Sequence, residues 1–282
     1  MIDYYKPEKI DGQLTAIRSR SGEIMYLIEG TERAFLIDTC LGIRGLKKLI
    51  KTLTEKPLSV ILTHGHVDHA MGAPEFDTVY MNHKDKEVCR QHSPLQERRG
   101  YIAASIGGEE PWLLDDDNFV PPMPPDYHEL KDGAVFELGG ISLEVFELAG
   151  HTKGTMVVLI PEKRILITGD ACNTATFLFD ENSLPVEAYR ENLLRLQQKL
   201  EGRFDRVFMM HHQMEASKDL LKNVTEVCSD IMEGNADDEA FPFMGNTYYI
   251  AKKADKQFIR ADKREGNIIY NKQKIFKEGL GK

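Results

Sequence analysis

The sequence predicts an α/β fold in which two β-sheets pack face to face and helices cover their outer sides. Short apolar runs bounded by turn residues recur through the 282 residues, as in strands. Longer segments carry apolar residues at helical spacing, as in helices that cover a sheet. Because no repeat and no linker interrupts the chain, we expect a single domain over residues 1–282.

The first part of the chain predicts a hairpin, a helix and a buried strand. Apolar runs at Ile24–Ile28 and Ala34–Ile37 flank a polar turn, which is typical of a hairpin. A helix is predicted over residues 43–53 from its apolar spacing, with Pro57 closing it. The apolar run Leu58–Leu62 then suits a buried strand, and it leads directly into a group of histidines.

The middle of the chain is the least regular part. A strand is predicted at residues 78–81, followed by helices at about 84–91 and 95–106. The acidic, proline-rich segment that follows belongs to an expected insertion at about residues 93–125. Long loops in compact domains are usually functional, so this insertion is expected either to cover a binding cleft or to be a surface excursion.

Strands and helices alternate again in the second half. Gly139-Gly140 is a hairpin turn pair between two apolar runs. A stripe of Tyr189, Leu193, Leu196 and Leu200 predicts an amphipathic helix. The predicted elements are strands at 134–138, 141–148, 155–160, 164–167 and 207–210, helices at 187–200 and 217–232, and a C-terminal β extension at about 241–282 with two or three strands.

The composition is that of a globular enzyme and limits the possible partners. A net charge of −9 counts against a nucleic-acid enzyme, because phosphate binding requires a positive surface. The basic tail, residues 251–282, is either a solvated strand face or such a surface. No apolar run is long enough to span a bilayer and the first residues are polar, so a cytoplasmic protein without a membrane partner is expected.

Four potential metal ligands fall within six residues in the sequence THGHVDH. Side chains at i and i+2 of an extended segment point the same way, so His64 and His66 can bind one metal. Asp68 and His69 lie on the following turn and can reach a second metal. Imidazole and carboxylate ligands suit zinc, with iron or manganese as alternatives. Gly65 is expected to give the loop the freedom to turn.

THGHVDH resembles the H-x-H-x-D-H signature of the metallo-β-lactamase superfamily. Other segments resemble further landmarks of that family in the expected order, over about three-quarters of the chain. They are FLIDTCLG with Asp38, LAGHTKGT with His151, ILITGDAC with Asp170 and RVFMMHHQ with His211. The resemblance implies a four-layer αββα sandwich of two mixed sheets flanked by helices.

The resemblance also implies two divalent metal ions. The first would be bound by His64, His66 and His151, and the second by Asp68, His69 and His211, with Asp170 bridging both. The family's last histidine usually lies between glycines, which are missing here, so His212 stays an alternative to His211.

Several residues near these motifs keep two interpretations. Asp38 either orients a ligand by hydrogen bonding or caps the helix near Ile43. Cys172 either approaches the site or is a buried thiol, and the four scattered cysteines predict no disulfide or zinc knuckle. Trp112 either lines the cleft or anchors the insertion. The remaining histidines are expected not to be ligands, namely His83, His92, His128 and His212.

The activity that the resemblance implies is hydrolysis of a small molecule. A hydroxide bridging two metal ions would attack an ester, thioester, lactone or amide, and Asp68 would be the catalytic residue that orients it. The same fold hosts iron-dependent oxidoreductases such as persulfide dioxygenases, which are the main alternative, and nucleases or phosphodiesterases, which the acidic composition disfavours. No motif identifies substrate-binding residues or an oligomeric state.

Overall fold

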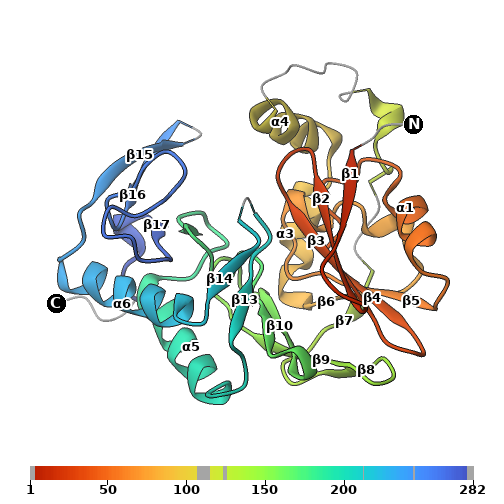
Figure 1. Cartoon of the computed structure of the whole chain (residues 1–282). Coiled ribbons are helices and arrows are strands. Elements are labelled where there is room, and N and C mark those ends of the chain that lie inside the picture. Colours follow the sequence, from red (N-terminus) through yellow and green to blue (C-terminus); the bar gives the residue numbers. More distant parts are fainter. Residues whose placement is uncertain (1–3, 107–114, 123–125, 212, 244, 278–282) are drawn as a thin grey trace. The chain divides into compact units, whose positions relative to one another are not determined.

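The computed structural model describes residues 4–106, 115–122, 126–211, 213–243 and 245–277 (Figure 1). Trp112, His212 and parts of the expected insertion lie outside the described residues. The chain forms two compact units. Unit 1 comprises residues 1–145 and 210–214, and unit 2 comprises residues 146–209 and 215–282.

Unit 1 contains a mixed seven-stranded sheet whose strands follow the order of the chain. The first three pairings are antiparallel and the last three are parallel, so the strands that come after β4 need crossover connections. The strands are β1 (Tyr5–Lys9), β2 (Leu14–Ser19), β3 (Ile24–Glu29), β4 (Ala34–Ile37), β5 (Leu58–Ile61), β6 (Val79–Met81) and β7 (His128–Glu129).

Four of the described α-helices belong to unit 1, and each follows a strand of the parallel part of the sheet. They are α1 (Leu46–Leu53), α2 (Val67–Ala70), α3 (Lys86–His92) and α4 (Leu95–Ser105). Helix α1 buries Leu46 and Ile50, as its spacing predicts. It begins three residues later than predicted because Gly45 has a φ of 115°, a conformation outside the helix.

The boundary between the units falls inside β9 (Ser142–Glu147), whose first part forms a hairpin with β8 (Val135–Glu137). Unit 2 continues with β10 (Met156–Ile160), β11 (Ile165–Ile167), β13 (Arg206–Phe208) and β14 (Glu215–Ser217). Strands β11 and β13 are parallel, whereas β10–β11 and β13–β14 are antiparallel. Unit 2 therefore also contains a mixed sheet.

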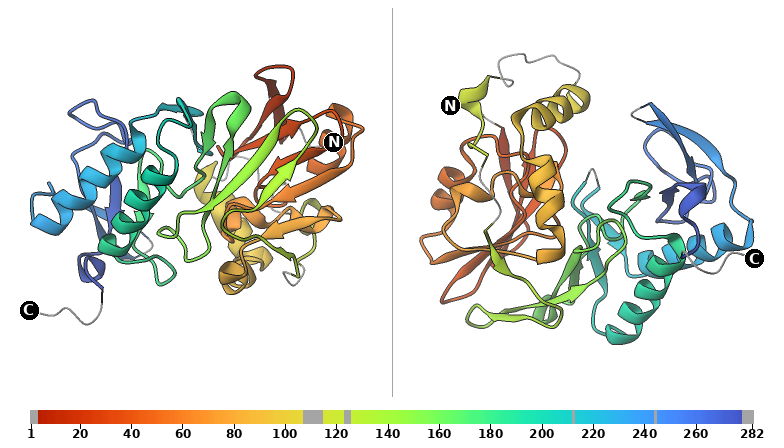
Figure 2. Two further views of the ribbon diagram at one scale, coloured as in Figure 1. Left: turned by 90° about the horizontal axis from the view of Figure 1, so that it is seen from below. Right: turned by 180° about the vertical axis from the view of Figure 1, so that it is seen from behind.

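Helices α5 (Val186–Lys199) and α6 (Leu220–Glu233) lie side by side in unit 2 (Figure 2). The predicted stripe of α5 is buried, with Tyr189 and Leu193 inaccessible to solvent. Both helices contribute to one apolar core cluster that includes Leu159, Val207 and Val224. This cluster holds the ends of β9 and β11, from which the candidate ligands of unit 2 project.

The strands of the C-terminal segment belong to a four-stranded sheet. Its strands run in the order β12 (Thr176–Leu178), β17 (Ile268–Tyr270), β16 (Asn246–Ile250) and β15 (Glu239–Phe243). Strand β12 precedes α5 in the chain and pairs in parallel with β17. The tail strands expected from the sequence are present, and a strand that was not predicted connects them to the body of unit 2.

The mixed α/β class is confirmed. Each unit supplies a mixed sheet and helices, which are the parts that a four-layer sandwich requires. Among the helices of the described residues, none combines the length and the apolar character needed to cross a membrane.

Candidate metal centre

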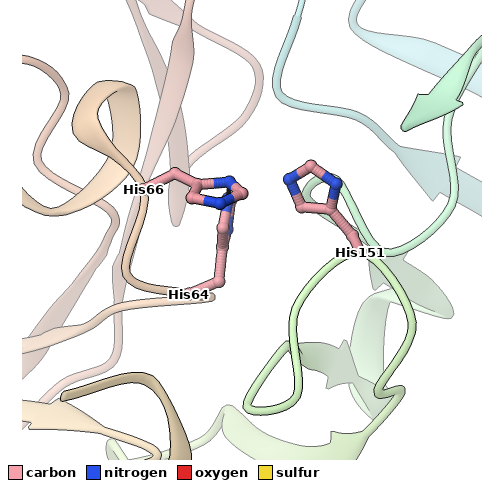
Figure 3. Close-up of side chains that lie close together, drawn as sticks. All are labelled: His64, His66 and His151. Carbon is pink, nitrogen blue, oxygen red and sulfur yellow. Dashed lines mark hydrogen bonds between the residues drawn. The ribbon is translucent and has the colours of Figure 1, made fainter. Parts of the chain in front are cut away.

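The loop after β5 places four of the predicted ligands in unit 1. His64, His66, Asp68 and His69 are all buried. His64 and His66 come from the same loop, as predicted for side chains two residues apart (Figure 3). The Nε2 atom of His64 lies 3.1 Å from the Nδ1 atom of His66. Two imidazole nitrogens thus converge on one point within the loop.

His211 joins this loop from the segment that follows β13. The segment 210–214 belongs to unit 1, where the amide of Ile24 donates a hydrogen bond to the carbonyl of Met210. The Nε2 atom of His211 lies 3.1 Å from Nε2 of His69 and 3.3 Å from Oδ2 of Asp68. The third separation, between His69 Nε2 and Asp68 Oδ2, is 3.6 Å.

These three donor atoms have the spacing of ligands around a metal ion. Nitrogen and oxygen ligands about 2.0–2.2 Å from a tetrahedral zinc lie roughly 3.3–3.6 Å from one another. The observed separations of 3.1, 3.3 and 3.6 Å fall on or near this range. The donor set of Asp68, His69 and His211 therefore fits one face of a tetrahedral site.

Asp38 orients His69. Its Oδ2 atom accepts a hydrogen bond from Nδ1 of His69 at 2.6 Å, so the opposite nitrogen, Nε2, is the one that faces Asp68 and His211. The same carboxylate accepts bonds from the amide and the hydroxyl of Thr63, both at 2.6 Å. The alternative role, capping of the following helix, does not fit, because the N-cap of α1 is Gly45.

Gly65 is required for space rather than for an unusual backbone angle. It is not among the glycines with positive φ. A Cβ atom at this position would lie 2.8 Å from the carbonyl oxygen of Asp85 and 2.9 Å from the amide of Cys89. The expectation that Gly65 serves the turn through its conformational freedom is therefore wrong, and close packing of the segment at the start of α3 is the physical reason for a glycine.

Unit 2 contains the candidate ligands His151 and Asp170. His151 lies on the loop between β9 and β10, and Asp170 follows β11 (Figure 3 shows His151 on its loop). The Nδ1 atom of His151 bonds to the carbonyl oxygen of Phe177 at 2.8 Å. This leaves Nε2 as the nitrogen that lies 3.7 Å from Oδ2 of Asp170. The two side chains thus form a second donor pair, within unit 2.

The loop that carries His151 is packed closely against α5. A Cβ atom added at Gly150 would lie 2.1 Å from the ring of Tyr189. The hydroxyl of Tyr189 donates a hydrogen bond to the carbonyl of Ala171, the residue after Asp170. Tyr189 therefore contacts the chain next to both candidate ligands of unit 2.

Cys172 is a buried thiol. It is inaccessible to solvent, and burial raises its pKa to about 12. A thiol with this pKa is protonated near neutral pH and is a poor nucleophile. All four cysteines are buried and free, which agrees with the absence of paired spacing in the sequence.

Three residues near the ligands were not predicted. Thr63 bonds to Asp38, the carbonyl of Phe177 holds His151, and the hydroxyl of Tyr101 on α4 donates to Asp68 at 2.8 Å. Thr63 could have been noticed beside His64. No sequence pattern marks Tyr101, because only the fold brings α4 to the loop that carries Asp68.

The histidines expected not to be ligands occupy other positions. Nδ1 of His92 accepts a hydrogen bond from the amide of Val67, and its ring lies 4.8 Å from that of His66. His83 bonds to the carbonyl of Tyr127, and His128 packs beside Tyr80. His92 thus contacts the loop that carries His66 and Asp68.

Comparison with known proteins bears on both the fold and the motifs. The chain matches the human acyl-coenzyme A thioesterase MBLAC2 with 26% identity over 176 residues, covering 52% of this chain and 57% of the relative. It matches the atrochrysone carboxyl ACP thioesterase AgnL7 of Paecilomyces divaricatus with 26% identity over 166 residues, covering 57% and 43%. The chain thus spans about half the length of these curated relatives.

A solved structure, the metallo-beta-lactamase from Pontibacter korlensis, shares the fold. It aligns with a TM-score of 0.57 at 20% identity, over 79% of this chain and 97% of that one. The sequence pattern of the metallo-beta-lactamase superfamily matches residues 24–211, from β3 to the last predicted ligand. Because this match covers most of the chain, the protein belongs to the metallo-beta-lactamase superfamily.

Proposed function

We propose that this protein is a metal-dependent hydrolase that cleaves thioesters with a pair of divalent metal ions, which we take to be zinc. One metal would be held by His64, His66 and His151, the other by Asp68, His69 and His211, and Asp170 would be shared. The proposal is supported above all by the three donor atoms of Asp68, His69 and His211, which are spaced as metal ligands within one unit.

The side chains have different roles in the proposed reaction. When bound, the metal ions supply acidified water and positive charge for the developing oxyanion. Asp38 keeps Nε2 of His69 turned toward the metal, as the carbonyl of Phe177 does for Nε2 of His151. Asp68 orients the attacking water and takes up its proton. No serine or cysteine nucleophile is required, and the buried Cys172 is unsuited to that role.

The substrate class is proposed from the relatives and from the composition. Two of the relatives bear thioesterase names, although each is matched over only about half its length. Water would add to the acyl carbon, the carbon–sulfur bond would break, and a carboxylic acid and a thiol would be released. The net charge of −9 favours a small-molecule substrate over a nucleic acid.

The proposal is tested by metal analysis of the purified protein together with release of free thiol from a series of acyl thioesters. Two equivalents of zinc and thioester turnover are expected. In Asp170→Ala and in His66→Ala we expect lower metal content and a loss of kcat/KM greater than the roughly 10- to 100-fold typical of residues that only support ligands.

The matched control is His128→Ala, which removes an exposed histidine beside Tyr80. It should keep wild-type metal content and turnover. Full metal content and full activity in either ligand variant would refute the ligand assignment. Bound iron with oxygen consumption and no thioester turnover would point instead to the oxidoreductases of this fold.

A further inference from the structure

Helix α4 brings a tyrosine hydroxyl to the carboxylate of Asp68, in the loop after β5. The hydroxyl of Tyr101 donates a hydrogen bond of 2.8 Å to Oδ2 of Asp68, which is 8% exposed. The same oxygen lies 3.3 Å from Nε2 of His211 and 3.6 Å from Nε2 of His69. Tyr101 therefore contacts the one atom of Asp68 that the two histidine nitrogens face.

The position of Tyr101 is set by the packing of α4. Arg98, one turn earlier, is 1% exposed and donates from Nε to the carbonyl of Ser93 and from Nη1 to the carbonyl of Val120. Ile102 is buried beside it, and α4 packs against α2, which carries Asp68. The ring of Tyr101 itself packs against the core of unit 1. The hydroxyl is thus presented from an anchored helix.

We infer that Tyr101 is a positioning residue that holds the carboxylate of Asp68 in the rotamer required to bind the second metal ion. An aspartate carboxylate can turn about its Cβ–Cγ bond, and a donor fixed on another helix restricts that rotation. Without the hydroxyl, Oδ2 is no longer held at the point shared with His69 and His211. The inference rests on the proposed pair of metal ions.

This role assigns a purpose to part of the segment 93–125. Helix α4 supplies a residue that supports the ligands, instead of acting only as a cover or as a surface excursion. The hydroxyl of Tyr101 bonds to a ligand of the proposed second metal ion. His64 and His66 approach each other through other atoms, Nε2 and Nδ1. Loss of the hydroxyl should weaken the second metal ion selectively.

The test is zinc titration of the metal-stripped full chain, followed by competition with a chelating dye. Wild type should bind two equivalents. In Tyr101→Phe the second equivalent should bind about 10- to 100-fold more weakly, while the first equivalent keeps its affinity. The control is Tyr127→Phe, which removes a hydroxyl from another half-buried tyrosine packed on the same core and should bind both equivalents like wild type.

The outcomes separate the inference from the proposed function. If wild type binds two equivalents and Tyr101→Phe binds both with unchanged affinity, the role of Tyr101 is refuted and the metal pair stands. If wild type binds fewer than two equivalents, the proposed function fails and this inference fails with it. Urea unfolding of the metal-stripped variants should give the wild-type midpoint. Equal weakening of both equivalents together with a lower midpoint would show a general structural defect and overturn the inference.

Discussion

Asp38 shows how one residue can combine an uncommon backbone conformation with a buried hydrogen-bond network. Its φ of 62° lies in the left-handed region, which aspartate and asparagine tolerate better than most other residues. In that conformation the carboxylate accepts bonds from Thr63 and His69 while being 1% exposed. An acidic residue that adopts this conformation without large strain is therefore suited to the position.

Asp38→Asn should keep the backbone and impair the metal centre. The amide offers one acceptor oxygen, whereas the carboxylate accepts three hydrogen bonds, so a buried donor loses its partner. The free energy of unfolding should therefore fall by about 1–3 kcal/mol. Metal affinity should fall about 10- to 100-fold. Zinc competition and urea unfolding measure both effects.

The control for that substitution is Asp77→Asn, because Asp77 is 93% exposed and pairs with Lys47 at the surface. Its stability should change by less than about 0.5 kcal/mol and its zinc affinity should not change. Wild-type zinc affinity in Asp38→Asn would contradict the orienting role of the carboxylate.

At the scale of elements, the sequence predicted most strands and helices that carry apolar patterns. Strands β3 to β6 and helices α1, α5 and α6 lie close to their predicted positions because each buries an apolar run or stripe. Strands β1 and β2 were not predicted: β1 exposes four of its five residues and lacks a buried face. Strands β12 and β14 were not predicted either, and β14, Glu-Ala-Ser, contains no apolar run.

The contact between Gly150 and α5 leads to a prediction at this scale. Gly150→Ala would place a methyl group 2.1 Å from the ring of Tyr189, so either α5 or the loop with His151 must shift. Such overpacking should destabilise the fold by about 1–3 kcal/mol. Zinc affinity should fall as well, because the loop carries a proposed ligand.

Gly100→Ala is the opposite case and serves as the control. Gly100 lies inside α4, and a Cβ atom there would have no neighbour within 4 Å. Alanine should therefore stabilise the fold by about 0.5–1 kcal/mol through helix propensity. Urea unfolding curves of the two variants should shift in opposite directions, and equal shifts would contradict the packing argument.

At the scale of the whole molecule, the buried thiols predict a loss of stability in alkali. Burial raises the pKa of Cys89 and of Cys172 from 9.0 to about 12. The folded protein therefore retains protons that the unfolded chain releases, and the free energy of unfolding should fall as the pH rises from about 9 toward 12. Below pH 9 these thiols should add no pH dependence.

The measurement is the urea midpoint of the metal-stripped protein at pH 7.5, 9 and 10.5. Wild type should lose stability between the last two values. Cys172→Ala should show a smaller decline, because one of the shifted groups is removed. A midpoint that stays constant up to pH 10.5 would contradict the assignment of protonated, buried thiols.

The candidate ligands could be predicted because they cluster in motifs, whereas the groups that support them could not. THGHVDH places four candidate ligands within six residues, and resemblance to the other family landmarks points to three more. The hydroxyl of Tyr101 and the carbonyl of Phe177 meet their partners only through folding, from positions 33 and 26 residues away in the chain. A backbone carbonyl is present at every residue, so no sequence pattern distinguishes that of Phe177.

The chain passes between the two units at three points, after Val145, after Met209 and after Met214. The short stretch 210–214 thus belongs to unit 1, although its neighbours on both sides belong to unit 2, and it carries His211. A truncated gene ending at residue 145 would encode nearly all of unit 1 and still omit a proposed ligand. Any attempt to produce unit 1 alone must include those five residues, for instance joined through a linker after residue 145.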